Sequence, residues 1–319
     1  MRTDLLSANA VLAANRIAPY IRSTPLDHSP WFSEQTGAQV YLKLENLQYT
    51  GSFKLRGAFN KLLSMSDRDR AAGCVVASSG NHGAASAYAM ARLGANGIVF
   101  VPEQTSTTKV GAIRAAGAEV RFFGTDGLDT EAHARAFATE RGMHYVSPYN
   151  DPDVIAGQGS CGVEIAGQLS GVDAVFVAVG GGGLIGGAGS FLKSVNTRVS
   201  VIACQPEASP VMTRSVQAGR ILDLPSDPTL SDGTAGGIES DSITFELCKS
   251  VVDDYILVSE EQITTAMRAF MDWHHMLAEG AAGVALAGLL ASGKRFRDRK
   301  VVVIVCGGNI SRETLRKVI

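Results

Sequence analysis

Short apolar runs alternate with longer amphipathic or alanine-rich stretches along the chain. The apolar runs form two series, at residues 40–45, 74–77, 97–101 and 119–123, and then at 174–179, 199–204, 255–258 and 300–306. Apolar runs of this length, separated by stretches with helical periodicity, are typical of strands in a parallel sheet that is covered on both faces. The pattern therefore predicts an α/β fold with two open, mainly parallel sheets.

Two turns that join a predicted strand to a predicted helix consist of small and polar residues. Ser-Ser-Gly-Asn-His-Gly at 78–83 follows the strand at 74–77, and four consecutive glycines at 180–183 follow the strand at 174–179. Open α/β sheets bind ligands at the carboxyl ends of their strands, and backbone N–H groups at a helix N-terminus bind anions. Both turns are therefore candidate ligand sites, although Ser and Asn also serve as ordinary helix caps.

A lysine lies among small residues where a helix is expected to begin, in Gly51-Ser52-Phe53-Lys54-Leu55-Arg56-Gly57. The unpaired N–H groups and the positive end of a helix disfavour an ammonium ion and favour a neutral amine. A neutral amine attacks a carbonyl carbon to form a Schiff base, so Lys54 is a candidate covalent anchor. An exposed surface lysine is the alternative that these seven residues leave open.

The glycine turn also has the spacing of a nucleotide site, because Gly181, Gly183 and Gly186 fit the pattern G-x-G-x-x-G. A dinucleotide fold needs an acidic residue at the end of the next strand, where it binds the ribose. That strand, at 199–204, is followed by Gln205 instead. The sequence therefore disfavours nicotinamide and flavin, and a nucleotide-binding regulatory protein remains a separate class of function to consider.

Four motifs occur in order along the chain: Ser-Phe-Lys-x-Arg-Gly at 52–57, Ser-Ser-Gly-Asn-His-Gly at 78–83, the glycines with a leucine at 180–184, and Cys-Gly-Gly-Asn at 306–309. In order and spacing they resemble the threonine dehydratase and serine racemase branch of the fold-type II pyridoxal-phosphate enzymes. The resemblance spans nearly the whole chain. Leu55 and His82 favour this branch over the related cysteine and threonine synthases.

The resemblance implies a fold like that of the tryptophan synthase β subunit, with the active site between two α/β domains. The large, pyridoxal-phosphate-binding domain is expected to contain residues 1–52 and 146–319, and the small domain residues 53–145. A homodimer is also implied.

The resemblance further implies a role for individual residues. Lys54 matches the lysine that holds pyridoxal 5'-phosphate as a Schiff base and removes the substrate's α-proton. Phe53 is expected to pack against the cofactor ring, and Asn81 to hydrogen-bond the ring hydroxyl oxygen. The phosphate cradle matches Gly180, Gly181, Gly182, Gly183 and Leu184. The loop for the substrate carboxylate matches Ser78, Ser79, Gly80, Asn81 and His82.

Two further residues match positions beside the cofactor. Cys306 stands where this family has Ser, Thr or Cys opposite the pyridine nitrogen. A thiol does not keep that nitrogen protonated as a carboxylate does, so the ring withdraws electrons less strongly and loss of a β-leaving group is favoured. Glu279 matches a cofactor-side glutamate. A buried structural cysteine and a helix-capping acid are the alternative interpretations of these two residues.

The implied reaction removes water from a β-hydroxy-α-amino acid such as L-threonine or L-serine and yields a 2-oxo acid and ammonia. Ser79 matches the second base of the racemase, so racemisation or β-replacement on the same scaffold is an alternative. The loop at 232–237, Asp-Gly-Thr-Ala-Gly-Gly, indicates a specialised pocket. Phenylserine, 3-hydroxyaspartate and a hydroxyectoine-derived acid are therefore alternative substrates.

No metal site is expected. Metal-activated relatives carry acids at the places of Gln205 and Val211, and both oxygen ligands are lost here. His275 and Glu279 have i, i+4 spacing, but the sequence offers no further ligand beside them.

Composition excludes several other classes of protein. The chain has 319 residues, 45% of them hydrophobic, which is enough for a large core. Its net charge of −2 is unsuited to nucleic-acid binding. No apolar run reaches the length of a membrane span or resembles a secretion signal. The five cysteines are scattered and odd in number, as in a protein with reduced thiols. A cytoplasmic location is therefore expected.

Overall fold

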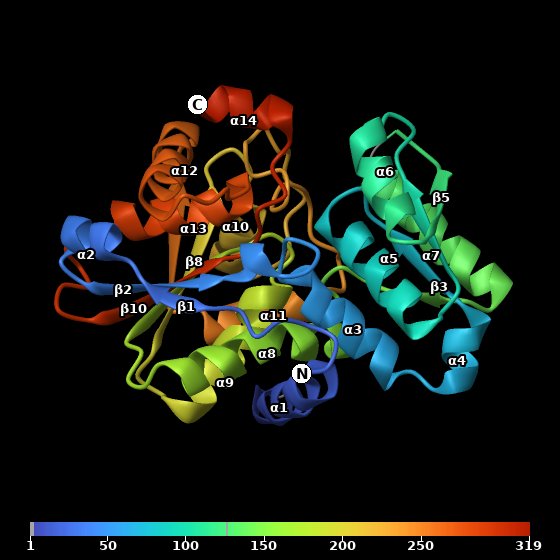
Figure 1. Ribbon diagram of the computed structural model, residues 1–319, viewed down its shortest axis with the longest axis horizontal. Coiled ribbons are helices and arrows are strands. Elements are labelled where there is room, and N and C mark those ends of the chain that lie inside the picture. Colours follow the sequence, from blue (N-terminus) through green and yellow to red (C-terminus); the bar gives the residue numbers. More distant parts are fainter. Residues whose placement is uncertain (1–2, 126) are drawn as a thin grey trace.

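The computed structural model describes residues 3–125 and 127–319 and contains two sheets, each flanked by helices (Figure 1). The larger sheet has six strands in the order β1-β2-β10-β7-β8-β9. These are β1 (Leu26–His28), β2 (Gln39–Leu44), β7 (Ala174–Ala178), β8 (Ser200–Pro206), β9 (Asp254–Val258) and β10 (Lys300–Val305). β1 pairs antiparallel with β2, and all the other neighbours pair in parallel.

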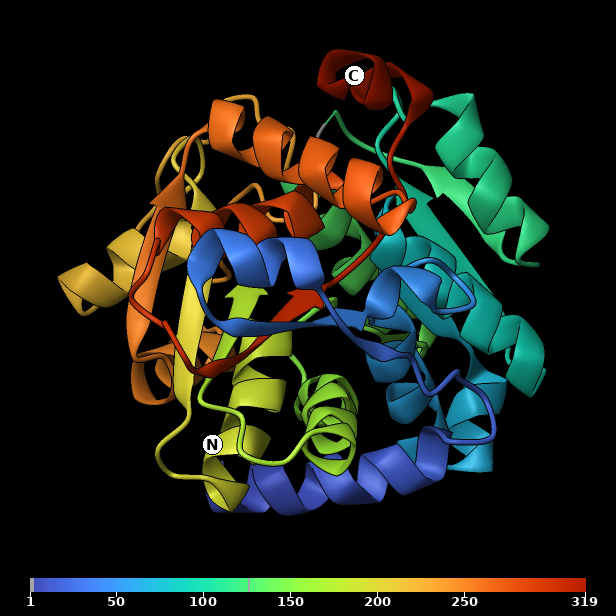
Figure 2. The same ribbon diagram turned by 60° about the vertical axis from the view of Figure 1, so that its left-hand side comes forward.

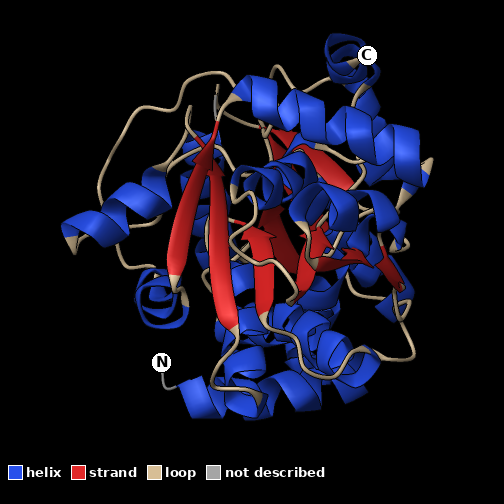
Figure 3. Ribbon diagram, turned by 90° about the vertical axis from the view of Figure 1, so that its left-hand side faces the viewer, coloured by secondary structure: helices blue, strands red, loops and turns tan. Residues whose placement is uncertain are grey.

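Helices cover both faces of the larger sheet (Figures 2 and 3). α13 (Gly280–Ala291) packs directly on β7, β8, β9 and β10, and α2 (Pro30–Thr36) and α12 (Glu260–His274) pack on α13, with α14 (Arg312–Val318) against α12. The other face is covered by α8 (Pro152–Gln168) and α9 (Gly183–Val195), with α1 (Thr3–Ile17) outside them. α11 (Ile243–Val251) packs beside α9, and α10 (Val211–Ala218) packs on α11. Burial on both faces accounts for the continuous apolar sequences of β7 and β10.

The smaller sheet has four parallel strands in the order β5-β4-β3-β6. These are β3 (Cys74–Ala77), β4 (Gly97–Val101), β5 (Glu119–Phe122) and β6 (His144–Tyr145). Successive side chains of β3 point to opposite faces, so Val76 packs towards α5 (Asn81–Leu93) and α6 (Thr107–Ala115), while Val75 packs towards α7 (Gly127–Arg141). Two layers of helix therefore enclose this sheet as well.

α3 (Lys54–Ser64) lies between the two sheets and begins at the candidate anchor lysine. It packs on both α5 and α8, and the contact with α8 is close because glycines face it. A Cβ added to Gly157 would lie 2.6 Å from the carbonyl oxygen of Arg56, and one added to Gly57 would lie 2.4 Å from the amide of Gln158. The position of α3 is therefore fixed by backbone contact. The short 3-10 helix η1 (Glu45–Leu47) follows β2, and α4 (Asp67–Ala72) leads from α3 to the smaller sheet.

The predicted two-sheet α/β fold and the eight predicted strands are present. Strands β1 and β6, of 3 and 2 residues, were not predicted, because so short a run has no detectable alternation. Ser259 and Gln262 form the expected capping box at the start of α12. The division of the chain after residues 52 and 145 stays a prediction. Across the described residues, no helix is both long and apolar enough to cross a membrane.

Candidate active site

Three strands of the two sheets end at the predicted motifs. β3 is followed by Ser78, β7 by the glycine turn, and β10 by Cys306. The carboxyl ends of parallel strands are where open α/β sheets bind ligands. The structure therefore brings together, between the two sheets, motifs that lie more than two hundred residues apart.

Lys54 occupies the first position of α3, as predicted. Its Nζ donates a hydrogen bond to the carbonyl oxygen of Pro148 at 2.9 Å and lies 5.3 Å from the centroid of the Phe53 ring. Burial lowers the pKa of Lys54 to about 8, against the opposing influence of Cys306 and Glu279. The amine is therefore partly neutral near physiological pH, as attack on a carbonyl requires.

The segment that carries Lys54 is paired with the segment that carries Cys306. The N–H of Phe53 donates to the carbonyl oxygen of Cys306 at 3.0 Å, and Ser52 forms an antiparallel bridge with Gly307. Burial, followed by the nearby Glu279 carboxylate, raises the pKa of the Cys306 thiol well above its ordinary value. Cys306 is therefore a neutral thiol beside the anchor lysine.

Glu279 stands at the start of α13 and faces the same region. Its carboxylate accepts two hydrogen bonds from Nδ2 of Asn81, at 2.8 and 2.9 Å, and one from the N–H of Asn309 at 3.1 Å. Burial raises the pKa of Glu279, and these hydrogen bonds oppose the rise. A Cβ on Gly307 would lie 2.6 Å from the carboxylate, so a side chain there would displace Glu279 from this position.

Asn81, at the first position of α5, is joined to the larger sheet through Asn309 as well as Glu279. Nδ2 of Asn309 donates to Oδ1 of Asn81 at 2.7 Å and to the carbonyl oxygen of Thr50 at 2.8 Å. Sequence reasoning assigned no role to Asn309, although the motif at 306–309 contains it. The hydrogen bond from Asn81 to the ring hydroxyl oxygen of the cofactor stays a prediction.

The turn after β3 presents Ser78, Ser79 and Gly80 at a partly exposed surface. The N–H of Gly80 donates to Oγ of Ser78 at 3.2 Å. The ring of His82 points elsewhere: it is buried, and its Nε2 lies 2.9 Å from the carbonyl oxygen of Val146. Burial, and then the charge of Lys54, lower the pKa of His82 to about 3, so the ring is neutral. The side chain of His82 links α5 to the segment after β6, and its backbone belongs to the predicted loop for the substrate carboxylate.

The glycine turn leaves no room for side chains. A Cβ on Gly181 would lie 2.3 Å from Cγ of Tyr149, and Gly182 has a φ of 82° with Cys248 Sγ only 2.8 Å from a Cβ position. Gly180 and Gly183 are similarly confined, by Thr234 and Tyr149, and Leu184 is buried behind them. The first N–H groups of α9 face this turn without intrahelical partners, which makes it suitable for a phosphate.

Tyr149 and Thr244 complete this cradle, and sequence reasoning missed both. The ring of Tyr149 covers Gly181, and Oγ1 of Thr244 donates to the carbonyl oxygen of Gly181 at 2.5 Å. These residues lie more than thirty and sixty positions from Gly181 in the chain. Only packing in three dimensions brings them together, so no local pattern could have identified them.

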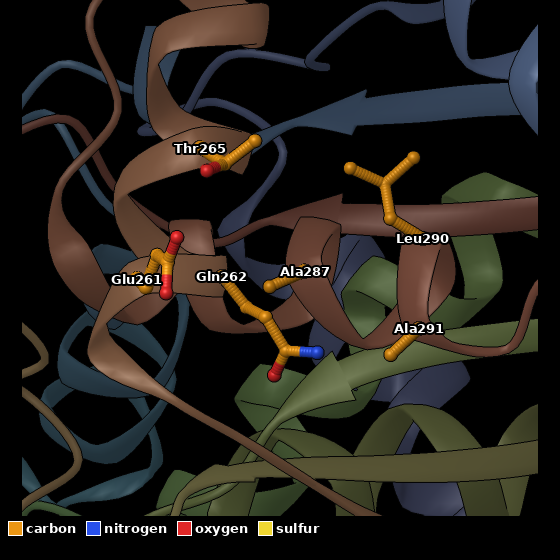
Figure 4. Close-up of a pocket in the computed structure, with 6 residues that line it drawn as sticks. All are labelled: Glu261, Gln262, Thr265, Ala287, Leu290 and Ala291. Atoms are coloured by element: carbon orange, nitrogen blue, oxygen red, sulfur yellow. The ribbon is translucent and has the colours of Figure 1, made fainter.

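A shallow cavity of about 260 Å³ lies between α12 and α13, away from these residues (Figure 4). Its lining consists of Glu261, Gln262, Thr265, Ala287, Leu290 and Ala291. None of them contacts Lys54 or the glycine turn, so the cavity is separate from the candidate active site.

The fold and the site together define an enzyme that holds an aldehyde- and phosphate-bearing cofactor. A buried amine without a carboxylate partner fits the aldehyde, and a turn that a Cβ would obstruct fits the phosphate. Residues 17–307 match the family model of the pyridoxal-phosphate dependent enzymes, and the chain belongs to that family. Its cofactor is therefore pyridoxal 5'-phosphate.

Known proteins that are similar to this chain show to which branch of the family it belongs. The catabolic L-threonine dehydratase of Escherichia coli is 40% identical over 301 residues, which are 93% of this chain and 91% of that protein. The structure of tomato threonine deaminase isoform 2 superposes with a TM-score of 0.94 and is 31% identical in sequence. The match covers 100% of this chain and 88% of the tomato chain. The structure of maize serine racemase superposes with a TM-score of 0.91 and is 29% identical in sequence. That match covers 97% of this chain and 95% of the maize chain. The predicted branch is confirmed.

Dialysis against EDTA should leave both the turnover and the melting temperature unchanged, and added Mg²⁺ or Ca²⁺ should have no effect. Oε1 of Gln205 accepts from the N–H and Oγ1 of Thr213 at 2.7 and 2.6 Å, and its Nε2 donates to the carbonyl oxygen of Ser209 at 3.4 Å. The side-chain amide of Gln205 is thus engaged in hydrogen bonds with its neighbours, and Val211 has no side-chain oxygen that could bind a metal ion. Activation of the EDTA-treated enzyme by either cation, in a steady-state assay, would contradict the prediction.

Proposed function

We propose that the protein is a pyridoxal-phosphate-dependent ammonia-lyase that converts L-threonine or L-serine to a 2-oxo acid and ammonia. The observation that carries this proposal is the buried Lys54 amine, with a pKa lowered to about 8, beside the neutral thiol of Cys306. Similarity to a named L-threonine dehydratase over 93% of the chain supports the same reaction.

Individual residues act as follows in this proposal. Lys54 anchors the cofactor and then moves the α-proton of the substrate with its neutral amine. Gly180, Gly181, Gly182 and Gly183 hold the phosphate, and the turn at 78–80 with the N-terminus of α5 holds the substrate carboxylate. When bound, pyridoxal phosphate withdraws electrons from the substrate's α-carbon. The neutral thiol of Cys306 would not protonate the pyridine nitrogen of the bound cofactor as a carboxylic acid would, and this would favour loss of the β-hydroxyl.

The rate of cofactor loading should rise with pH and level off above a midpoint near pH 8. Only the neutral form of Lys54 attacks the aldehyde, and burial lowers the pKa of this amine to about 8. An ordinary lysine has a pKa of about 10.4, which would put the midpoint more than two units higher. The measurement is the rate at which the visible band appears when pyridoxal phosphate is added to cofactor-free protein. A rate that still rises steeply at pH 10 would refute the lowered pKa.

Amino-acid racemisation is the second candidate function. Ser79 lies in the partly exposed turn after β3, opposite Lys54 across the site in the proposed arrangement, and maize serine racemase has the same fold. Replacement of Ser79 by Ala separates the two functions, because a second base is needed for racemisation and not for elimination.

We also propose a homodimer in the cytoplasm. Leu5 and Leu12, two exposed apolar side chains on α1, support association of this helix with a second copy. The five cysteines are buried and unpaired, which suits a reducing compartment. Light scattering gives the mass of the particle, and a monomer at assay concentration would contradict the dimer.

Product analysis tests the proposed function. L-Threonine and L-serine should each yield the 2-oxo acid and ammonia in equal amounts. Accumulation of D-serine without oxo acid would assign the racemase instead. If both amino acids are inert, phenylserine, 3-hydroxyaspartate and hydroxyectoine-derived acids are the next substrates to assay.

A further inference from the structure

The segment between α10 and α11 is hydrogen-bonded to Glu260 at the start of α12, and an arginine on α7 joins it to the smaller sheet's helices. Nη2 of Arg135 lies 2.9 Å from Oε1 of Glu131, also on α7, and 2.9 Å from Oε1 of Glu239 in that segment. The guanidinium carbon lies 4.2 Å from the centroid of the Tyr145 ring. One arginine nitrogen thus forms ion pairs with two carboxylates, one on a helix that flanks the smaller sheet and one in the segment between α10 and α11.

The charges in this cluster are unbalanced, because two carboxylates share one guanidinium. The side chains of Glu131 and Glu239 are only 21% and 19% exposed. The other groups around Glu239 are neutral, namely Asn150 and the phenols of Tyr145 and Tyr149, whose pKa values are raised mainly by burial. Burial raises the pKa of Glu239, the hydrogen bond from Asn150 opposes this, and the Glu131 carboxylate adds to the rise. Glu239 therefore retains a proton more readily than an ordinary carboxyl group does.

Glu239 also contacts the cover of the glycine turn. Its N–H donates to Oη of Tyr149 at 3.0 Å, and its Oε2 accepts from Nδ2 of Asn150 at 2.7 Å. Tyr149 is the residue whose ring covers Gly181, and Pro148 accepts the hydrogen bond of Lys54. Residues 148–150 therefore join the anchor lysine, the glycine turn and Glu239.

A second link between this segment and the smaller sheet is weaker. Nζ of Lys109 on α6 lies 3.3 Å from Asp232, and both side chains are exposed. Exposed ion pairs contribute little because water and salt screen them. The contact at Glu239, whose side chain is less than half as exposed as that of Lys109, is therefore the stronger link between the segment and the smaller sheet.

We propose that Glu239 is a positioning residue that, through the arginine-bridged pair with Glu131, couples the placement of the smaller domain to that of Tyr149 over the phosphate cradle. The role of the glycine turn in phosphate binding rests on the proposed function. The coupling between the smaller domain and Tyr149 does not depend on a bound cofactor. The bridged state binds a proton more tightly than the separated state. Its stability is therefore greatest in acid and is lost as pH rises from the ordinary carboxyl pKa of 4.5 to the raised value of Glu239.

Amide hydrogen exchange of the holoenzyme tests this coupling. The amides of Glu239 and Ile243, which donate to Tyr149 and to Oδ1 of Asn150, report on the bridged state. Because the pKa of Glu239 is raised in the bridged state, protection in the wild type should fall several-fold from pH 4.5 to pH 8 after correction for intrinsic exchange. In Glu131→Gln, the like charge is gone while the amide oxygen still accepts from Arg135. This variant should keep high protection across the range.

Two further variants complete the test. Glu140→Gln makes the same charge change at an exposed position of α7 and should behave as the wild type. Arg135→Met removes the bridge and should lower protection at every pH, and it should weaken pyridoxal-phosphate binding in an equilibrium titration. If Arg135→Met does not fold, the pH dependence of amide protection in Glu131→Gln is sufficient to test the coupling. The same pH-dependent loss of protection in Glu131→Gln and in the wild type would overturn the coupling, even in an enzyme with full lyase activity. A protein that shows the coupling but binds no pyridoxal phosphate would instead refute the proposed function.

Discussion

Replacement of Lys54 by alanine should remove the visible cofactor band and abolish turnover. Lys54 is the amine that the structure places between Phe53, Pro148 and Cys306, and in the proposed reaction it is both the covalent anchor and the base. Loss of a residue with both roles leaves no alternative group in the site, so an effect of several orders of magnitude is expected. The measurements are the absorption spectrum after addition of pyridoxal phosphate and the rate of 2-oxo acid formation.

The variant should nevertheless fold. Within the described residues, the Lys54 side chain makes a single hydrogen bond and no ion pair, and burial of its amine is unfavourable. The melting temperature of the cofactor-free variant is therefore expected to equal or exceed that of the cofactor-free wild type. Lys249→Ala, at an exposed position of α11, is the matched control and should retain the band and the activity. Normal turnover by Lys54→Ala would refute the assigned mechanism.

Replacement of Arg56 by methionine should lower the free energy of unfolding by about 3–5 kcal/mol. The Arg56 guanidinium is fully buried and forms hydrogen bonds of 2.7 Å to both oxygens of Glu45. It also binds both oxygens of Glu164, at 2.7 and 2.8 Å. Methionine fills similar volume but leaves the buried Glu45 without its cation. Urea denaturation of the cofactor-free protein measures the loss.

The matched control for Arg56 is Arg299→Met. Arg299 is 64% exposed and lies 3.4 Å from Asp173, so its removal should cost less than about 1 kcal/mol. A loss in Arg56→Met no larger than that of the control would contradict the importance of the buried network. Because Arg56 lies in the first turn of α3 with Lys54, the same variant should also bind pyridoxal phosphate more weakly.

The pH dependence of this variant has a definite sign. Burial by itself would raise the pKa of Glu45, but Arg56, and then Lys43, more than compensate and lower it. In the wild type, Glu45 therefore contributes stability above its ordinary pKa of 4.5, and that stability is lost as pH falls through the lowered value. Without Arg56, burial dominates and Glu45 takes up a proton more readily. The difference in stability between wild type and variant should accordingly shrink as the solution is acidified.

Much of the fold follows from local patterns in the sequence. The strands β3 and β4 were predicted with the bounds that the structure has, because continuous apolar runs end there at turn residues. The start of α3 at Lys54 and the start of α9 at the glycine turn were predicted for the same reason. Glycine, serine and asparagine act on the backbone within a few residues, so their effect is visible in the sequence.

Other parts of the site depend on packing between distant segments. His82 belongs to the predicted loop, yet its ring is buried against Val146, and the motif contains no information on this direction. The cover of Gly181 by Tyr149 and the link from Glu239 to Arg135 join residues from different elements. Such contacts depend on how the sheets and helices pack, which a single sequence does not reveal.

An absorption spectrum of the purified protein, recorded before and after addition of L-threonine with the oxo acid assayed in the same cuvette, tests the central claim most directly. The account predicts a visible band from the cofactor bound to Lys54, a change of that band on addition of threonine, and formation of 2-oxobutyrate. A protein that stays colourless after addition of pyridoxal phosphate would contradict the account.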